Sequence, residues 1–445
     1  MKNIIIFTDV NGSIGIGRYA GPYRIATEMR KNGWQVKVID FMMSFSNEEI
    51  LEIANRYKSD TLENWVGFSS TFLMPRKFDA FNARTSIREA TESGSSLGIP
   101  VAEAQQLVDN IRKSGFEVFI GGAKTKNDID NVHWINGQGE LKLFKGFDFT
   151  TSSIKYDDND HIFDDEHLPI EIARGCIFKC SFCSYQLNGK KLWEFCKSPD
   201  IIKNELLENY TRFGTTGYMF SDDTYNDSPE KVKSLLQIYK DLPFDIEFST
   251  YARLDLILSH PETLTQLIDS GMNSVFFGVE SFNHASGKII GKGMHPDRIK
   301  QGLLDIKKQY PELLVSTGFI AGLPYETPES LYETIEWLNN SPVDSYSFQV
   351  LSLGKNSLFG KNMEKYGYNL DKNGKWYNEH MNYDTALEIA NSAEYKSLSS
   401  FTFYNRLRNL GYSVSEIKNL TIDYKDDIIN RTNDKIQIYK NKILQ

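Results

Sequence analysis

Three cysteines lie close together near the middle of the chain. Cys176, Cys180 and Cys183 fall within the segment RGCIFKCSFCSY, residues 174–185, with the spacing C-x-x-x-C-x-x-C. A disulfide framework is disfavoured, because the chain has only four cysteines and they are not evenly spread. Zinc would need a fourth ligand, such as Cys196, and usually binds paired C-x-x-C knuckles. Three thiolates on one short loop fit a four-iron, four-sulfur (4Fe–4S) cluster better, with one iron left open to coordinate a further molecule.

The composition is that of a globular protein with more than one domain. The chain has 445 residues, of which 40% are hydrophobic and 24% are charged. Its net charge of −9 gives no support to nucleic acid as a partner. We find no signal peptide and no run of about 18 uncharged apolar residues of the kind that crosses a membrane. The composition therefore favours a cytoplasmic protein that is not inserted in a membrane.

Strand and helix patterns alternate over residues 1–150. Strands separated by helices in this way predict an α/β fold with a doubly wound, Rossmann-like parallel sheet. Ligands of such sheets bind at the carboxyl ends of the strands. The expected strands cover residues 3–10, 34–41, 65–72, 116–123 and 132–140. The glycine and small polar residues at their carboxyl ends are Asn11, Gly12, Ser69, Ser70, Gly121, Gly122 and Gly137.

An acidic segment, residues 151–167, follows this domain. Its stretch YDDNDHIFDDEH shows no helical or strand periodicity, so we expect an exposed linker. His161 and His167 also lie in it, and carboxylates with histidines are compatible with a metal site. A solvated linker is the simpler interpretation.

A second alternating array covers residues 168–355. Six strand–helix units predict a partial (β/α)6, TIM-like barrel, whose active site should lie at the carboxyl ends of its strands. The three cysteines come directly after the first of these strands. Residues 356–445 are expected to form a mixed, mostly helical extension that serves as packing material or as a lid. The expected barrel strands cover residues 168–174, 217–223, 245–253, 274–281, 314–322 and 344–353.

The cysteine spacing resembles the signature of the radical S-adenosylmethionine (SAM) superfamily. In that family the open iron of the 4Fe–4S cluster chelates SAM, and an electron from the cluster splits SAM to give a 5′-deoxyadenosyl radical. A single short strand-end match carries little weight, but here several occur in the family's order. The resemblance implies SAM contacts for Phe182 beside the adenine, Asp222 and Asp223 near the amino group, Ser249 and Arg253 near SAM, Glu280 at the ribose or amino group, and Gly318, Ile320 and Gly322 along the adenine.

The order of sheet domain, acidic segment and cysteine loop resembles the branch of this superfamily that carries an N-terminal cobalamin-binding domain. The likeness is carried by residues 21–41, 66–72, 119–125 and 135–140. One departure concerns the loop after the first strand, where some cobalamin proteins have D-x-H-x-x-G with a cobalt-ligating His. Asn11 stands at that position, so a bound cobalamin would have water or a weak ligand below cobalt. The resemblance implies cobalamin contacts for Asn11, Gly12, Ser69, Ser70, Gly121, Gly122 and Gly137.

The resemblance as a whole implies a cobalamin-dependent radical SAM methyltransferase that acts on an unactivated carbon of a small molecule or metabolite. Its cluster would be reduced by a partner such as flavodoxin or ferredoxin. Two alternatives stay open. One is a radical SAM oxidoreductase, isomerase or epimerase whose first domain no longer binds cobalamin. The other is a non-catalytic metal-binding protein.

Overall fold

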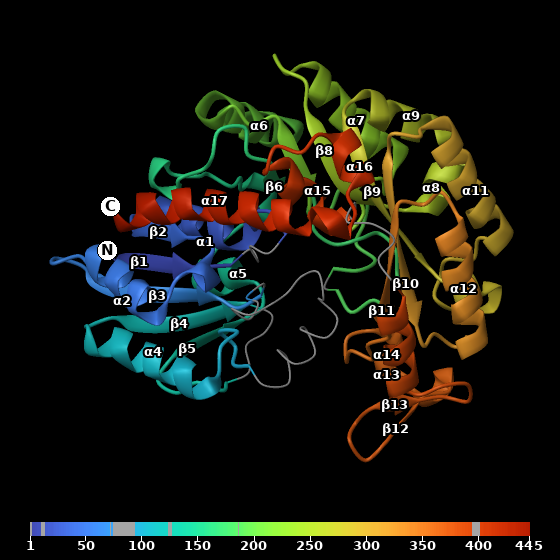
Figure 1. Ribbon diagram of the computed structural model, residues 1–445, viewed down its shortest axis with the longest axis horizontal. Coiled ribbons are helices and arrows are strands. Elements are labelled where there is room, and N and C mark those ends of the chain that lie inside the picture. The colour runs from blue at the N-terminus through green and yellow to red at the C-terminus, as the bar shows by residue number, and fades with distance from the viewer. Residues whose placement is uncertain are drawn as a thin grey trace.

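The fold consists of two parallel β-sheets with helices packed against them, joined by a helical C-terminal region (Figure 1). The computed structural model describes residues 2–9, 14–71, 73, 94–122, 127–185, 187–393 and 401–445. The predicted α/β class, with a Rossmann-like sheet before a partial barrel, is confirmed. Within the described ranges no helix is both long and apolar enough to cross a membrane.

The first sheet has five parallel strands in the order β2-β1-β3-β4-β5. Strand β1, with the sequence KNIIIF, is buried from its second residue onward, because helices or other side chains cover both faces of this central strand. The chain order reverses beside β1, which is where doubly wound sheets open a crevice for ligands. The elements are β1 (Lys2–Phe7), α1 (Ala20–Lys31), β2 (Gln35–Ile39), α2 (Asn47–Arg56), β3 (Glu63–Ser69), α4 (Val101–Lys113), β4 (Glu117–Gly122), β5 (His133–Asn136) and α5 (Gly139–Leu143).

The second sheet has six parallel strands in the order β11-β10-β9-β8-β7-β6. Sequential strands are neighbours throughout, so their carboxyl ends share one edge, as the partial-barrel prediction requires. Proline in the first turn of α6, α7, α9, α11 and α12 fixes where these helices begin. The strands are β6 (Leu168–Ile170), β7 (Gly217–Phe220), β8 (Glu247–Ala252), β9 (Met272–Glu280), β10 (Leu314–Ala321) and β11 (Ser345–Val350). The helices are α6 (Pro199–Phe213), α7 (Pro229–Lys240), α8 (Leu254–Ser259), α9 (Pro261–Asp269), α10 (His284–Ile289), α11 (Pro296–Gln309) and α12 (Pro328–Asn340).

The C-terminal region contacts both domains. Helix α15 packs on the inner face of the barrel sheet, where Asn405 donates a hydrogen bond to Ser249 (2.5 Å) and the Phe401 N–H donates to Ser316 (2.9 Å). Helix α17 runs along the N-terminal domain (Figure 1), and the Tyr439 hydroxyl accepts a hydrogen bond from the Asp40 N–H. The region therefore ties the domains together. Its elements are α13 (Leu358–Lys361), β12 (Asn369–Leu370), β13 (Trp376–Tyr377), α14 (Tyr383–Ser392), α15 (Phe401–Arg408), α16 (Val414–Asn419) and α17 (Lys425–Leu444).

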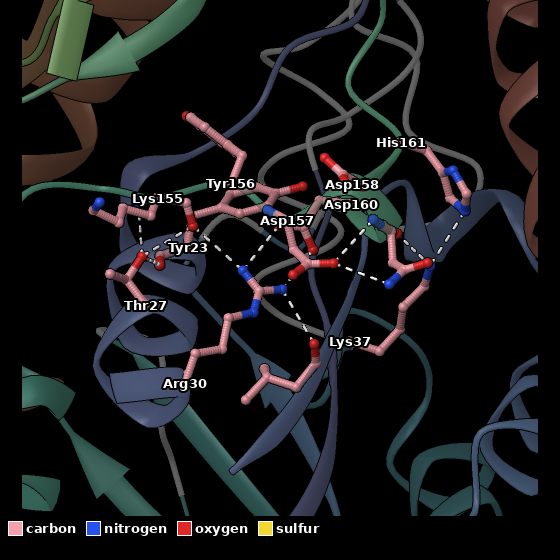
Figure 2. A network of polar contacts seen from close by, with 12 residues as sticks. Tyr23, Thr27, Arg30, Lys37, Lys155, Tyr156, Asp157, Asp158, Asp160 and His161 are labelled. Carbon is pink, nitrogen blue, oxygen red and sulfur yellow. Dashed lines mark hydrogen bonds and ion pairs between the residues drawn. The ribbon is translucent and has the colours of Figure 1, made fainter. Parts of the chain in front are cut away.

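The prediction that the acidic segment is an exposed linker is wrong for its central residues. Asp160 and Glu166 are 0% and 2% exposed. Asp160 accepts hydrogen bonds from both terminal nitrogens of Arg30, at 2.7 and 3.0 Å (Figure 2). Glu166 pairs with the buried Arg18 at 2.9 Å. Cationic side chains from more than 100 positions earlier neutralise these carboxylates, so these ion pairs hold the acidic segment against the N-terminal domain.

The two histidines of this segment have structural partners. His161 lies 3.2 Å from the Lys37 ammonium (Figure 2), and burial, together with that charge, lowers the pKa of His161 to about 4. His161 is therefore neutral at pH 7 and does not repel Lys37. His167 is buried, and its Nε2 lies 2.6 Å from the Glu247 carboxylate at the start of β8.

Replacing Glu247 should loosen the contact between α15 and the barrel. Burial alone would raise the pKa of Glu247, but hydrogen bonds and charges from His167 and Arg408 lower it to about 2. A folded pKa below the unfolded value of about 4.3 stabilises the fold above that pH, and the benefit is lost as pH falls from about 4.3 toward 2. We expect Glu247→Gln to lower stability by about 2 kcal/mol at pH 7, measured as a lower melting temperature. Glu333→Gln, on the exposed face of α12, is the control, and equal melting temperatures for the two variants would contradict this role.

Candidate functional site

The cysteine loop follows β6 and is fixed by contacts with two later segments. The Ser181 hydroxyl donates to the Ile289 carbonyl (2.8 Å), and the Ser181 N–H donates to the Ile290 carbonyl (3.3 Å). The Phe359 N–H of α13 donates to the Ser181 carbonyl at 3.0 Å. The central residue of the loop is thus anchored at the end of α10 and the start of α13, and the partly buried cysteines on either side of it are unpaired.

All three cysteines of the loop line one pocket at the carboxyl ends of the barrel strands, as the barrel geometry predicts. Four of the predicted SAM-binding residues line it as well, namely Phe182, Asp223, Arg253 and Glu280. Sequence reasoning missed other wall residues, although several are chain neighbours of the predicted ones, because the sequence does not tell which residues of a strand end face the pocket. These are Phe178, Tyr185, Asn188, Thr224, Tyr251, Ala252, Phe276, Gly278 and Lys292.

Two cationic side chains, Arg253 and Lys292, line the same pocket as the cysteine thiols. Arg253 donates a hydrogen bond to the Cys180 sulfur (3.7 Å), and its guanidinium lies 3.8 Å from the centre of the Phe178 ring. Burial raises the pKa of Cys180, and the charges of Lys292 and Arg253 oppose that shift. A cluster bound by three thiolates is anionic, so these two cations would offset the cost of burying it. The donor set therefore fits an iron–sulfur cluster.

The three thiols do not form a ready-made site for a single metal ion. Among the described residues, no group of three or more His, Cys, Asp or Glu side chains could hold one ion. Ligands of a four-iron cluster bind different iron atoms, so they need not converge on one point. Three thiols that share a pocket are therefore compatible with the ligand set of one cluster.

Glu280, the last residue of β9, adopts an unusual backbone conformation. Its φ angle of 72° lies in the left-handed region, which a residue other than glycine rarely occupies. Its carboxylate pairs with Lys292 at 2.8 Å, and both side chains line the pocket. Strain of this kind persists where the surroundings fix a side chain for a task. The arrangement holds one carboxylate at the pocket wall, available to hydroxyl or amino groups of a ligand.

Glu280→Gln should weaken SAM binding while leaving the metal content unchanged. Loss of the charge removes a charge-assisted hydrogen bond, which is worth about 1.5–3 kcal/mol, or roughly 10- to 100-fold in affinity. The measurement is SAM affinity by anaerobic equilibrium dialysis, with iron and sulfide content measured alongside. Glu262→Gln, on the surface of α9 away from the pocket, is the matched control. An unchanged SAM affinity in Glu280→Gln would exclude a direct contact.

Two predicted SAM residues lie outside the pocket walls. Asp222 is buried and accepts hydrogen bonds from the backbone N–H groups of Ala173 (2.5 Å) and Ile172 (3.2 Å), and burial raises its pKa to about 6. It joins the segment after β7 to the residues between β6 and the cysteine loop. Ser249 faces Asn405 of α15.

The three β10 residues predicted to lie along adenine are not among the pocket walls either. Gly318 makes room for the Phe276 ring, since a Cβ there would lie 2.5 Å from a ring carbon. Gly322 has a φ of 100° and lies under the Trp376 ring. Ile320 is 7% exposed and belongs to the hydrophobic core.

A second pocket opens at the carboxyl edge of the N-terminal sheet. Four residues predicted to contact cobalamin line it, namely Ser69, Gly121, Gly122 and Gly137. Ser70 is fully buried beside them, and Asn11 and Gly12 lie outside the described residues. The other wall residues are Ile6, Gly21, Pro22, Ile25, Phe68, Thr71, Phe119, Ile135, Gly139, Glu140 and Leu143.

Glycines keep this second pocket open. A Cβ on Gly21 or Gly137 would meet no atom within 4 Å, and one on Gly121 would make only ordinary contacts, the nearest at 3.7 Å. Side chains at these positions would project into the cavity. An apolar pocket with glycine backbone at its base suits a flat, bulky ligand, because the ligand can approach the strand ends closely. The pocket therefore fits part of a large organic cofactor such as cobalamin.

Residues 170–338 match the model of the radical SAM superfamily. The chain is 27% identical over 178 residues to an uncharacterized methyltransferase of Pyrococcus horikoshii, covering 40% of this chain and 38% of that protein. It is 24% identical over 193 residues to the bacteriochlorophyllide d C-8(2)-methyltransferase of Chlorobaculum tepidum, covering 42% of each. The chain thus spans about two fifths of the length of these curated relatives.

The similarity in fold extends over nearly the whole chain. The structure of the radical SAM methyltransferase TsrM of Kitasatospora setae, with cobalamin and a 4Fe–4S cluster bound, aligns with a TM-score of 0.59 and 14% identity. The alignment covers 98% of this chain and 100% of TsrM. At this identity the likeness concerns the fold, and the fold includes both sheets.

Proposed function

Residues 170–338 are a radical SAM domain, and we propose that the chain as a whole is a cobalamin-dependent methyltransferase that acts on an unactivated carbon of a small molecule. The observation that carries this proposal is the presence of two pockets of different chemistry in one chain. One is lined by three thiols and charged groups, and the other by glycines and apolar side chains. When bound, the cluster with SAM would supply a carbon-centred radical, and cobalamin would supply a methyl carrier.

In the barrel pocket, Cys176, Cys180 and Cys183 would ligate the cluster. Asp223 and Glu280 would take the amino group or hydroxyls of SAM, because carboxylates accept hydrogen bonds from both. Arg253 would take the SAM carboxylate or offset the cluster charge, since a guanidinium pairs well with either. Tyr251 and Phe276 would bound the pocket on the side toward α15 and keep water from a reactive radical.

In the N-terminal pocket, Gly121, Gly122 and Gly137 would let the cofactor approach the sheet backbone closely. Gly122 has a φ of 129° and lies against Thr71 and Ser70, so the backbone here is folded tightly around small residues. Ile25, Phe119 and Leu143 would cover the apolar part of the ligand.

Isotope transfer tests this function. The anaerobic, reduced protein is incubated with SAM carrying a deuterated methyl group, with cobalamin, and with a metabolite extract. We expect a small molecule that gains the labelled methyl group only when cobalamin is present. Formation of 5′-deoxyadenosine without any labelled product, and independent of cobalamin, would instead favour a radical SAM oxidoreductase, isomerase or epimerase.

A further inference from the structure

An ion pair and the backbone that follows it connect the two pockets. Glu140, in the first turn of α5, lines the N-terminal pocket and is 6% exposed. Its carboxylate accepts a hydrogen bond from the guanidinium of Arg174, which is 34 residues later in the chain. Arg174 stands two residues before Cys176. One side chain at the wall of the first pocket is therefore bonded directly to the start of the cysteine loop.

Arg174 is held from three sides. Its Nε and Nη2 donate to the two oxygens of Glu171, at 3.2 and 3.1 Å, opposite the contact with Glu140. Its guanidinium also lies 4.5 Å from the centre of the Phe149 ring. Glu171 is shared with Arg24 of α1, whose side chain is fully buried, at 3.2 Å. Two carboxylates thus balance two guanidiniums in an enclosed interface between the domains.

Gly175, the residue after Arg174, connects the Arg174 ion pairs to the cysteine loop. Gly175 has a φ of 74°, and its N–H donates to the Asp223 carboxylate at 2.8 Å. A Cβ on Gly175 would lie 2.5 Å from Leu187, so the chain packs closely against Leu187 at this residue. The next residue, Cys176, has its sulfur 3.2 Å from the Thr224 hydroxyl. Movement of Arg174 would therefore disturb Asp223, Thr224 and Cys176 together, all of which line the barrel pocket.

We propose that the Glu140–Arg174 pair couples the two pockets, so that a ligand in the N-terminal pocket strengthens SAM binding in the barrel pocket. This inference rests on the proposed function. A ligand in the N-terminal pocket displaces water from beside Glu140, and in the resulting lower dielectric the pair with Arg174 is stronger. Arg174 then holds Gly175 and Cys176 in the geometry that receives SAM. By linkage, bound SAM strengthens ligand binding in the N-terminal pocket by the same factor.

The test measures SAM affinity by anaerobic equilibrium dialysis on the cluster-bearing protein, with and without saturating hydroxocobalamin. We expect hydroxocobalamin to tighten SAM binding about fivefold or more in the wild type. In Glu140→Gln this factor should fall to about one. The factor is a ratio of two SAM affinities of the same variant at saturating hydroxocobalamin, so a change in hydroxocobalamin affinity does not enter it. Without the Glu140 carboxylate, Arg174 and Arg24 share only Glu171. Arg174 then has no ion pair with a residue of the N-terminal pocket. Hydrogen exchange of residues 174–183 should slow on addition of hydroxocobalamin in the wild type and not in Glu140→Gln.

Glu117→Gln provides the matched control. Glu117 is another carboxylate of the N-terminal domain, at the start of β4; it pairs with Arg112 at 3.0 Å and is not among the pocket walls. This variant should keep the full coupling factor. An equal factor in the wild type and Glu140→Gln, or a factor of one in the wild type, would overturn the coupling. If hydroxocobalamin does not bind at all, the proposed function fails together with the coupling, whereas binding of both ligands without coupling removes the coupling alone.

Discussion

Cys176→Ala should abolish SAM cleavage. Three thiolates are the fewest that hold a 4Fe–4S cluster with one open iron, and no other cysteine lines the barrel pocket to replace a lost one. Without the cluster no electron reaches SAM, so formation of 5′-deoxyadenosine should fall by about a thousandfold or more, to the uncatalysed background. Iron and sulfide content after anaerobic reconstitution should fall in parallel. The measurements are product quantification by mass spectrometry and metal analysis of the same sample.

Cys196→Ala is the control for this result. Cys196 is the fourth cysteine, and it lies in a different surface groove together with Trp193 and Lys231. Burial raises its pKa, as expected of an inert thiol that packs as a small apolar side chain. This variant should keep its iron, its sulfide and its SAM cleavage. Loss of iron in Cys196→Ala with retention in Cys176→Ala would contradict the assigned ligand set.

Gly121→Val should remove cobalamin binding and leave the cluster intact. Gly121 is in β4, where a β-branched residue suits the strand, and its backbone requires no positive φ. Its Cβ would meet no atom closer than 3.7 Å, so the added side chain fits the fold and fills the N-terminal pocket. We expect corrinoid retention to fall by at least about tenfold. Corrinoid absorbance after gel filtration, with iron content measured in the same fractions, gives both quantities.

Gly121→Ala tells whether corrinoid is lost because the pocket is filled or because the domain is destabilised. Its single methyl group takes up less of the cavity, so corrinoid retention should be intermediate between the wild type and Gly121→Val. Melting temperatures of both variants should stay near that of the wild type. Full corrinoid retention by a folded Gly121→Val protein would mean that cobalamin binds elsewhere.

The architecture and the chemical core of the barrel pocket were predictable from local patterns. Apolar runs alternating with helical segments define both sheets, and the cysteine spacing identifies the loop after β6. Strand ends of parallel sheets converge, which is why Asp223, Arg253 and Glu280 meet the cysteines. The adjacent Asp222 shows the limit of this reasoning. Successive residues point to opposite sides of extended backbone, and the sequence does not tell which of two neighbouring aspartates faces the ligand.

Contacts between distant segments could not be predicted. The acidic residues of this segment have the composition of a solvated linker. They are buried because Arg30 meets Asp160 (Figure 2) and Arg18 meets Glu166 in the folded chain. Ser249 was expected at SAM, but the C-terminal helix α15 occupies its side of the sheet. Lys292 lies in an irregular segment after α10, where a single lysine has no distinguishing sequence context. Each of these contacts depends on segments that meet only in the folded chain.

The most direct test of the proposed function is the cofactor content of a single anaerobic preparation. The protein is reconstituted with iron, sulfide and hydroxocobalamin, freed of unbound material by gel filtration, and analysed for iron, sulfide, zinc and corrinoid. We expect about four iron and four sulfide per chain, together with about one corrinoid and no stoichiometric zinc. A cluster without corrinoid would contradict the cobalamin-dependent methyltransferase, and zinc without sulfide would contradict radical chemistry at this site altogether.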